Sequence, residues 1–511
     1  MIPKFPLIVT LVIAGLIAWQ QITAHVMRSL GTLILMVLWL VLLGLWWALR
    51  KRGVHLIRLG ILIVGFAAIS FTARRVLRYE GSADGSAFPQ LVFRWQKKNT
   101  PVLPKLPAAE TAAPAVDEPP PAGAADMPRF LGAAGDGILL EPDWQTDWQA
   151  HPPREVWRQA IGLGWSGFAV AGRRAITQEQ RGEDEYVTCY DLTDGKLLWS
   201  HADKALFTEA LGGDGPRATP TVDVAKGVVF ALGGTGILNC LDVKTGAVKW
   251  SRKALQDAGN APQLEWGKSS SPLLIGDVVV CSGGSKGASL LAWRRDSGEL
   301  SWTAGDDGGS YSSPVLLTLA GREQIVSVNR ESVTGHDPVG GKVLWTFAWP
   351  GKTPKVCQPV AVGTAQVLLT SSYGKKSHLL EIGASGETLT CKAVWSSTAP
   401  RTKFSSASVF GTHAYALDEG TLACVDLATG ERGWRDGRYG FGQQIRVGEH
   451  WLLVQAEKGF VALVKPNAER LDEVSRLEAL SAKTWNPPTL AGRWLLVRND
   501  REVICFEIPA K

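Results

Sequence analysis

The chain has 511 residues, of which 20% are charged and 45% hydrophobic, and its formal net charge is +6. This composition excludes a disordered or collagen-like chain, and the small net charge argues against a dedicated nucleic-acid binder, which would carry a basic stripe. The 55 glycines and 21 tryptophans indicate many turns and a recurrent aromatic packing position. The seven cysteines include no CxxC pair, so neither a zinc ribbon nor a full disulfide framework is indicated.

Three apolar runs near the N-terminus predict transmembrane helices at about 5–22, 30–49 and 55–73. Each run has about 18–20 residues, enough to cross roughly 30 Å of hydrocarbon. Buried globular helices, or a cleavable signal peptide for the first run, are the alternatives. Three runs in succession, and the lack of a small-residue cleavage site, favour membrane spans. Residues 1–78 are therefore interpreted as a membrane anchor.

The charges that flank these spans do not fix their orientation. The loop Arg50–Arg52 favours the cytoplasm by the positive-inside rule and would place the chain after Ala73 outside. Arg74, Arg75 and Arg78 follow the third span and oppose this arrangement. Both orientations stay open on charge alone.

Residues 79–128 are interpreted as a juxtamembrane segment followed by a linker. The stretch from Pro101 to Pro128 contains eight Pro and eight Ala. Such a segment cannot bury a core and favours extended polyproline geometry. It predicts a semi-rigid spacer before the next domain.

A repeat fills the chain after the linker. From residue 154 onward, short runs rich in Val, Leu and Trp alternate with Gly-rich turns, which predicts an all-β fold. In the clearest copies, Asp lies two, Gly six and Trp ten residues after a start position. The eight starts are Cys189, Cys240, Ala292, Gly335, Glu381, Cys424, Ala462 and Cys505. Their mean spacing of about 45 residues is typical of four-stranded propeller blades. Residues 129–511 therefore predict an eight-bladed β-propeller.

The motif has a local physical explanation. Asp and Thr side chains bond to the turn backbone, Gly takes the positive-φ position, and Trp covers the seam to the next blade. The residues predicted to serve this structural role are Asp191, Trp199, Asp242, Trp250, Trp302, Asp337, Trp345, Asp426 and Trp434. The eighth copy ends without its last strand, whereas Glu155–Trp157 is a strand without a motif. We predict that this strand completes the last blade and closes the ring.

A triplet of mostly small or polar residues precedes each motif, as in Ala218–Pro220 and Ser270–Pro272. The triplets predict the innermost strands, with their polar tips lining a central channel. Basic residues beside them are either scattered charge at the channel mouth or a site that recognises an anionic ligand or partner segment. The candidate channel or ligand-binding residues are Trp165, Arg217, Thr219, Lys268, Tyr311, Gln358, Lys403, Gln443, Trp485 and Asn486.

The copies Asp242–Trp250 and Asp426–Trp434 match the tryptophan-docking pattern Ala-x-Asp-x-x-Thr-Gly-x-x-x-Trp, with Cys in place of Ala. Over about residues 154–511 the chain resembles the quinoprotein alcohol dehydrogenase-like superfamily. Its layout resembles membrane-anchored proteins with pyrroloquinoline quinone (PQQ)-like repeats. The resemblance implies a multi-pass anchor in the bacterial inner membrane and a propeller outside the cytoplasm.

The superfamily contains two kinds of function. One member is the propeller lipoprotein of the outer-membrane β-barrel assembly machinery, which is not an enzyme. Others are dehydrogenases that hold PQQ between a Trp and a disulfide of adjacent cysteines, with Ca²⁺ on carboxylate and amide oxygens. This sequence has no adjacent Cys pair and no Asp or Glu in its triplets. Asp306 and Asp307 are weak candidates for a cation site, with a solvated turn as the alternative.

These observations favour a non-enzymatic binding or scaffold module for a protein partner in the cell envelope. No catalytic residue, metal, cofactor or nucleic acid is expected. The alternative is a PQQ- and calcium-dependent alcohol or sugar dehydrogenase coupled to the membrane quinone pool.

Overall fold

The computed structural model describes residues 4–23, 28–49, 55–96, 103–106, 119–351, 353–386 and 388–511. The Arg50–Arg52 loop and half of the Pro/Ala-rich stretch, 101–102 and 107–118, lie outside these described residues. The chain divides into two compact units, of which the first contains residues 1–99 with 210–213, and the second residues 100–209 with 214–511.

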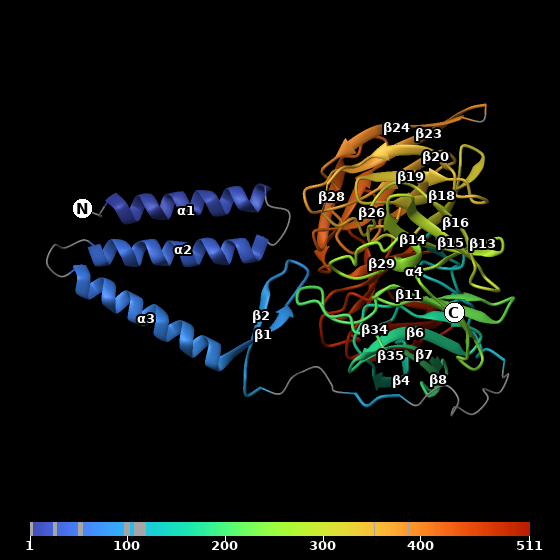
Figure 1. Cartoon of the computed structure of the whole chain (residues 1–511), viewed down its shortest axis with the longest axis horizontal. Coiled ribbons are helices and arrows are strands. Elements are labelled where there is room, and N and C mark those ends of the chain that lie inside the picture. The colour runs from blue at the N-terminus through green and yellow to red at the C-terminus, as the bar shows by residue number, and fades with distance from the viewer. Residues whose placement is uncertain are drawn as a thin grey trace. The chain divides into compact units, whose positions relative to one another are not determined.

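The first unit contains three helices and one hairpin (Figure 1). They are α1 (Lys4–Thr23), α2 (Arg28–Leu49), α3 (His55–Val76), β1 (Leu77–Ser82) and β2 (Pro89–Phe93). Among the described residues, two stretches are long and apolar enough to cross a membrane, Gly31–Leu49 and Leu56–Val76. The prediction of three spans is corrected at α1, where the apolar stretch is only Phe5–Trp19. The helix continues into the polar residues Gln20 and Gln21, so the apolar part covers only about 22 Å at 1.5 Å per residue.

The second unit contains eight sheets of four or five strands, which confirms the predicted eight-bladed propeller. The first blade consists of β5 (Ala169–Ala171), β6 (Arg174–Arg181), β7 (Asp184–Asp191) and β8 (Leu197–Asp203), and the second of β9 (Thr221–Asp223), β10 (Val228–Leu232), β11 (Ile237–Asp242) and β12 (Val248–Lys253). The third blade consists of β13 (Leu273–Ile275), β14 (Val278–Ser285), β15 (Ala288–Arg294) and β16 (Leu300–Ala304). The fourth blade consists of β17 (Val315–Leu319), β18 (Arg322–Val328), β19 (Ser332–His336) and β20 (Val343–Ala348). A short helix, α4 (Ala254–Asp257), follows β12.

The last four blades complete the ring. The fifth blade consists of β21 (Val360–Val362), β22 (Gln366–Leu369), β23 (Ser377–Ser385) and β24 (Thr388–Ser397), and the sixth of β25 (Ser408–Phe410), β26 (His413–Asp418), β27 (Thr421–Asp426) and β28 (Arg432–Arg438). The seventh blade consists of β29 (Gln443–Val447), β30 (Trp451–Gln455), β31 (Val461–Val464) and β32 (Glu473–Leu477), with β3 (Ile138–Leu139) as a fifth strand. The eighth blade consists of β33 (Thr489–Ala491), β34 (Trp494–Arg498), β35 (Glu502–Glu507) and β4 (Arg154–Ala160).

The N-terminal strand β4 closes the last blade, as the sequence predicts. It pairs antiparallel with β35, and Trp157 lies opposite Cys505. In Figure 1 the red strands β34 and β35 lie beside the teal strand β4. The eighth blade is therefore built from both ends of the propeller sequence, and β4 covers the edge that β35 would otherwise expose.

Tryptophans on the outer strands contact the turn of the following blade. The indole N–H of Trp157 donates to the Leu192 carbonyl at 2.8 Å, and that of Trp199 donates to the Val243 carbonyl at 3.0 Å. The ring of Trp199 lies so close to Gly246 that an added Cβ would fall 2.5 Å from it. Gly246 also has a φ of +73°, so both space and backbone conformation require glycine there.

The triplets do not form the innermost strands themselves. Only Gln443–Ile445 lies within one, β29, whereas the other seven triplets end immediately before or within two residues of the strand that follows. In several of them the third residue is Pro, as in Pro220 before β9, and Pro cannot donate to a strand ladder. The predicted position of the inner strands is therefore corrected, because seven of the eight inner strands begin after their triplet. The backbone of these triplets is then available for hydrogen bonds to neighbouring blades.

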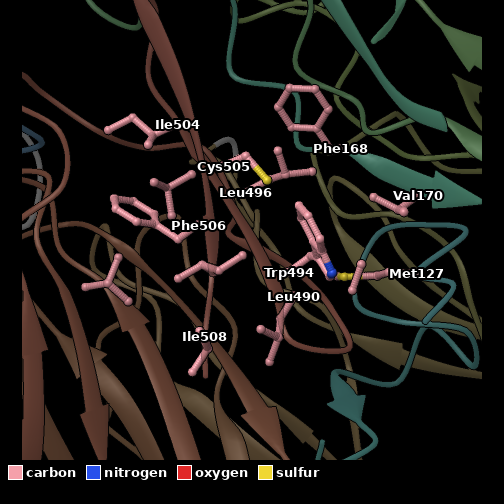
Figure 2. Close-up of a cluster of buried hydrophobic side chains, with 14 of the residues drawn as sticks. Met127, Phe168, Val170, Leu490, Trp494, Leu496, Ile504, Cys505, Phe506 and Ile508 are labelled. Atoms are coloured by element: carbon pink, nitrogen blue, oxygen red, sulfur yellow. The ribbon is translucent and has the colours of Figure 1, made fainter. Parts of the chain in front are cut away.

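The hydrophobic core of the last blade continues into a segment that precedes the repeats. Figure 2 shows Leu490, Trp494 and Phe506 with Met127 and Val170. Met127 is 3% exposed and exchanges backbone hydrogen bonds with Val170 at 2.8 and 2.9 Å. The indole N–H of Trp494 donates to the Ala122 carbonyl at 3.1 Å. The chain around residues 122–127 is thus packed on the propeller.

Candidate functional site

A belt of hydrogen bonds surrounds the propeller axis at the triplets. In the second to fifth blades, the backbone N–H of the triplet's middle residue donates to the middle side chain of the next blade's triplet, and in the first blade the third residue, Gly167, is the donor. The links run from Thr219 to Ser271 at 3.0 Å, from Ser271 to Ser313 at 2.9 Å, from Ser313 to Gln358 at 3.0 Å and from Gln358 to Ser406 at 2.9 Å. Gly167 N–H donates to Thr219 Oγ1 at 3.0 Å in the same manner. Thr219 and Gln358 therefore connect blades.

Two other predicted channel residues also connect blades. Gln443 Nε2 donates to the Phe404 and Trp485 carbonyls at 3.1 and 3.0 Å. Asn486 Nδ2 donates to the Gly164 and Ser166 carbonyls at 3.1 and 2.8 Å. Their amide groups thus join residues of neighbouring blades around the axis.

Three lysines precede the triplets of the third, fifth and sixth blades, and all three are buried. Lys268 is 1% exposed, and its ammonium donates to the Ser282 and Gly283 carbonyls at 2.5 and 3.1 Å. Lys355 donates to the Gly351 carbonyl at 3.1 Å. Burial lowers the pKa of both ammonium groups to about 8. These contacts give Lys268 and Lys355 a structural role.

Four aromatic side chains meet where the triplets of the sixth, seventh, eighth and first blades begin. We call Phe404, Phe441, Trp485 and Trp165 the aromatic mouth. Ring centroids are 4.9 Å apart for Trp165–Trp485 and for Phe404–Trp485, and 6.3 Å apart for Phe404–Phe441. The indole N–H of Trp485 donates to Glu457 Oε1 at 2.7 Å, which fixes the orientation of that ring.

Two lysines contact the aromatic mouth. Lys483 Nζ lies 4.1 Å from the ring centroid of Trp485 and 5.5 Å from that of Trp165. Lys403 Nζ lies 4.3 Å from the Phe441 centroid and 3.6 Å from a carboxylate oxygen of Glu419. A cation over an aromatic face at such a distance is attracted electrostatically to the ring. The arrangement combines apolar surface with positive charge.

The predicted residues Arg217 and Tyr311 lie on the second and fourth blades, at the same end of the inner strands. The guanidinium of Arg217 lies 4.6 Å from the Phe207 ring, and burial lowers its pKa to about 10. Tyr311 packs on Trp266 with ring centroids 5.5 Å apart, and its backbone N–H donates to the Lys355 carbonyl at 3.1 Å. The structure thus brings Trp165 and Trp485 into contact and places Lys403 against Phe441 of the same cluster, while Arg217 and Tyr311 belong to other parts of the ring.

A glycine-rich segment covers the opposite end of the axis. Residues 129–137 line three cavities together with the belt residues, and Leu131 contributes to all three. The cavities have volumes of about 10, 20 and 10 Å³, which is room for about one water molecule each. Val222 N–H donates to the Pro128 carbonyl at 2.7 Å and ties this segment to the second blade. We call residues 129–137 the axial plug.

The weak cation candidates Asp306 and Asp307 hold turns together. Asp306 accepts a hydrogen bond from Gly287 N–H at 3.0 Å. Asp307 accepts from Ser332 Oγ at 2.7 Å and from Glu331 N–H at 2.9 Å. Within the described ranges, no group of three or more His, Cys, Asp or Glu side chains is placed to hold a metal ion.

The sequence reasoning missed Lys355, Phe404, Phe441, Lys483 and the axial plug. A positional signal existed for Lys355, because it lies two residues before its triplet, as Lys268 and Lys403 do. Phe404 directly precedes its triplet, as Arg217, Tyr311 and Trp485 precede theirs. The plug carried no such signal, since a glycine-rich stretch next to a linker is typical of a loop.

The sequence matches a known protein family over two overlapping segments, residues 149–281 and 183–436, which together cover more than half of the chain. The family is described as outer membrane protein assembly factor BamB, and it is built from PQQ-like repeats. The chain belongs to this BamB-type family. No curated protein matches the sequence.

Solved structures of family relatives and of quinoproteins share the fold. BamB from Moraxella catarrhalis is 15% identical, with a TM-score of 0.51, and the match covers 70% of this chain and 100% of that one. A europium-containing methanol dehydrogenase is 11% identical, with a TM-score of 0.53 and coverage of 73% and 89%. A quinohemoprotein alcohol dehydrogenase from Pseudomonas putida HK5 is 11% identical, with a TM-score of 0.52 and coverage of 76% and 81%. At these identities the likeness establishes the fold alone.

The residues of this BamB-type chain do not fit a calcium-bound quinone. The carboxylates near the entry ends of the inner strands already accept hydrogen bonds from the propeller. Glu185 Oε1 accepts from Gly234 N–H at 3.2 Å, and Glu457 Oε2 accepts from Phe441 N–H at 3.1 Å. Burial raises the pKa of Glu185 to about 7, which further weakens it as a ligand for Ca²⁺. The sequence also lacks the adjacent cysteines on which the quinone would stack.

Proposed function

We propose that this chain is a non-enzymatic binding module that holds a segment of a protein partner at the aromatic mouth. The observation that carries the proposal is the contact of Lys483 with both Trp165 and Trp485, in a cluster assembled from four consecutive blades. Tryptophan is one of the residues that most often dominate the binding energy of protein interfaces. Lys483 favours a partner segment that carries acidic residues, whereas the buried Lys403 already forms an ion pair with Glu419.

Membership of the BamB-type family supports a role in the cell envelope. That family is described as an outer membrane protein assembly factor, which is a protein-binding role. We extend this to the present chain and propose that its partner is an envelope protein. The aromatic mouth supplies the apolar contacts, and Lys483 supplies the charge that steers an acidic segment into place.

The N-terminal helices provide the tether in this proposal. The stretches Gly31–Leu49 and Leu56–Val76 each match the length of a membrane span. We propose a multi-pass anchor in the bacterial inner membrane, with the propeller outside the cytoplasm. The family is described as an outer membrane protein assembly factor, and membership of it supports a propeller outside the cytoplasm.

Crosslinking from the aromatic mouth tests this proposal. In the full chain, expressed in its native membrane, p-benzoylphenylalanine replaces Phe441, and the matched control carries it in place of Leu140, which is 92% exposed. We expect a discrete adduct with an envelope protein from position 441 and none from position 140. The same adduct from both positions, or none from position 441, would contradict a binding site at the aromatic mouth.

A second experiment tests the alternative, a quinone-dependent oxidoreductase. The full chain in detergent is incubated with PQQ and Ca²⁺ and then desalted. Because the donor set does not fit the quinone, we expect no quinone absorbance to remain with the protein. A retained absorbance band that requires Ca²⁺ would favour the oxidoreductase.

A further inference from the structure

A basic pocket lies within the first unit, at the end of α3. Its walls are Phe71, Arg74, Arg75 and Arg94, and its volume is about 600 Å³. Arg74 and Arg75 belong to the last turn of α3, whose stretch Leu56–Val76 is apolar and long enough to span a membrane. The pocket therefore lies at the depth where that span meets the lipid headgroups.

Hydrogen bonds to carbonyls at the end of α3 hold Arg94 beside this pocket. Arg94 Nε donates to the Arg74 carbonyl at 3.0 Å and to the Leu77 carbonyl at 3.1 Å. Arg94 N–H donates to the Val76 carbonyl at 2.8 Å. Strand β2 is thereby tied to the end of α3, and Arg94 is held next to Arg74. The pocket is a built feature of the helix end and its hairpin.

The charge of the pocket is not balanced by protein carboxylates. Among the described residues, no Asp or Glu forms an ion pair with Arg74, Arg75 or Arg94. The nearest acidic partner in sequence, Glu80, pairs with Arg78 at 2.6 Å. Three guanidinium groups thus line one pocket and leave it positively charged, which favours an anionic ligand.

Exposed aromatic side chains accompany the pocket. Phe93 and Trp95 stack with ring centroids 4.6 Å apart, and they are 43% and 70% exposed. The Phe71 ring lies 5.0 Å from the Arg75 guanidinium and is 63% exposed. Aromatic residues are enriched at the level of lipid headgroups, where one face is apolar and the other is hydrated. The surroundings of the pocket therefore match a membrane interface.

We propose that this pocket binds the phosphate of an anionic phospholipid. Guanidinium groups match phosphate oxygens with paired hydrogen bonds, and basic pockets beside membrane spans bind anionic headgroups. Three arginines without a carboxylate partner favour a lipid with net negative charge over a zwitterionic one. The exposed aromatics place the pocket next to lipid, which makes the lipid phosphate its natural occupant. This inference is independent of the aromatic mouth.

The test measures which lipids stay bound to the full chain. The protein is purified in detergent with a mixture of phosphatidylglycerol and phosphatidylcholine, and bound lipids are counted by native mass spectrometry. The variant Arg74→Gln/Arg75→Gln is compared with the control Arg438→Gln/Arg470→Gln, which removes the same charge from exposed residues of the second unit. The variant Arg74→Lys/Arg75→Lys keeps the charge and reports on folding.

We expect the wild type, the control and the lysine variant to retain phosphatidylglycerol over phosphatidylcholine. In Arg74→Gln/Arg75→Gln this preference falls by about tenfold or more, because each basic residue near the headgroups contributes substantially to anionic-lipid affinity. Equal preference in wild type and Arg74→Gln/Arg75→Gln overturns the proposal. Loss of the preference in the control as well also overturns it. Displacement of the lipid by an equal concentration of inorganic phosphate would show a simple anion site and overturn the assignment to lipid.

Discussion

Trp157 and Cys505 face each other across the last two strands of the eighth blade, although they lie near opposite ends of the propeller sequence. The indole N–H of Trp157 also donates to the Leu192 carbonyl of the first blade. One side chain thus completes the last blade and joins it to the first. The closed ring gives the aromatic mouth its shape, because that cluster includes residues of the first and the last blades.

Trp157→Ala should destabilise the propeller strongly. The side chain is 8% exposed and lies against Gly195, so the substitution leaves a cavity and an unpaired carbonyl. Large-to-small substitutions of this kind cost about 3–5 kcal/mol. Chemical unfolding of the full chain measures the change. Trp95→Ala is the control because Trp95 is 70% exposed, and equal midpoints for both variants would show that the ring does not depend on this seam.

Ser271→Ala tests the belt around the axis. The substitution leaves the buried Thr219 N–H without its acceptor at 3.0 Å. A buried unsatisfied donor costs about 1–3 kcal/mol. We expect a loss of unfolding free energy in this range, compared with little change for Ser301→Ala, which removes an exposed hydroxyl. No difference between the two variants would mean that the belt contributes no stability.

The buried Lys268 predicts a specific pH dependence. Burial lowers its pKa from about 10.5 to about 8 in the folded state, so the unfolded chain binds more protons between these values. The contribution of Lys268 to stability is therefore least favourable below pH 8 and rises with pH across this window, by about 1 kcal/mol per pH unit. Lys268→Met removes this contribution.

The measurement is the free energy of unfolding of the wild type and Lys268→Met as a function of pH. The wild type should gain stability relative to the variant as the pH rises through the folded-state pKa of Lys268. The contributions of other titrating groups cancel when the two unfolding free energies are subtracted. A constant difference across the window would show that Lys268 keeps its ordinary pKa in the folded state.

A reporter fused after Lys511 tests the proposed orientation. The proposal places the propeller outside the cytoplasm, so a reporter that requires export should be active at this position. A reporter that requires the cytoplasm should be inactive in the matched fusion. The opposite pattern would reverse the topology and would place the aromatic mouth in the cytoplasm.

The repeat motif was sufficient to predict the fold, and local insertions explain where the prediction shifted. In six copies the predicted start residue lies opposite a Trp on the neighbouring outer strand, as Cys240 does opposite Trp250. In the fifth copy Leu379 lies opposite Trp395, instead of the predicted Glu381. The hairpin of β23 and β24 is unusually long, so the spacing within that copy no longer fixes the register.

The site was only partly predictable. Trp165, Lys403 and Trp485 follow from their position beside the triplets, which repeats along the sequence. Their contacts with Phe441 and Lys483 do not, because they depend on how neighbouring blades pack, and the contact of Lys483 with Trp165 depends on closing the ring between the last and first blades. Side chains such as Thr219 and Gln358 were read as channel-facing because small polar residues suit a channel. Their oxygens instead accept backbone hydrogen bonds from the neighbouring blade.

The most direct test of a partner-binding mouth combines crosslinking with charge reversal. The adduct formed from p-benzoylphenylalanine at position 441 is quantified in the full chain carrying Lys483→Glu or, as a control, Lys286→Glu, which reverses an exposed charge in the turn between β14 and β15. Lys483 lies over the rings of Trp165 and Trp485, so a carboxylate there would repel an acidic partner segment. We predict that the adduct falls by about tenfold or more with Lys483→Glu and persists with Lys286→Glu. An adduct of equal yield in both variants would contradict recognition of a partner at the aromatic mouth.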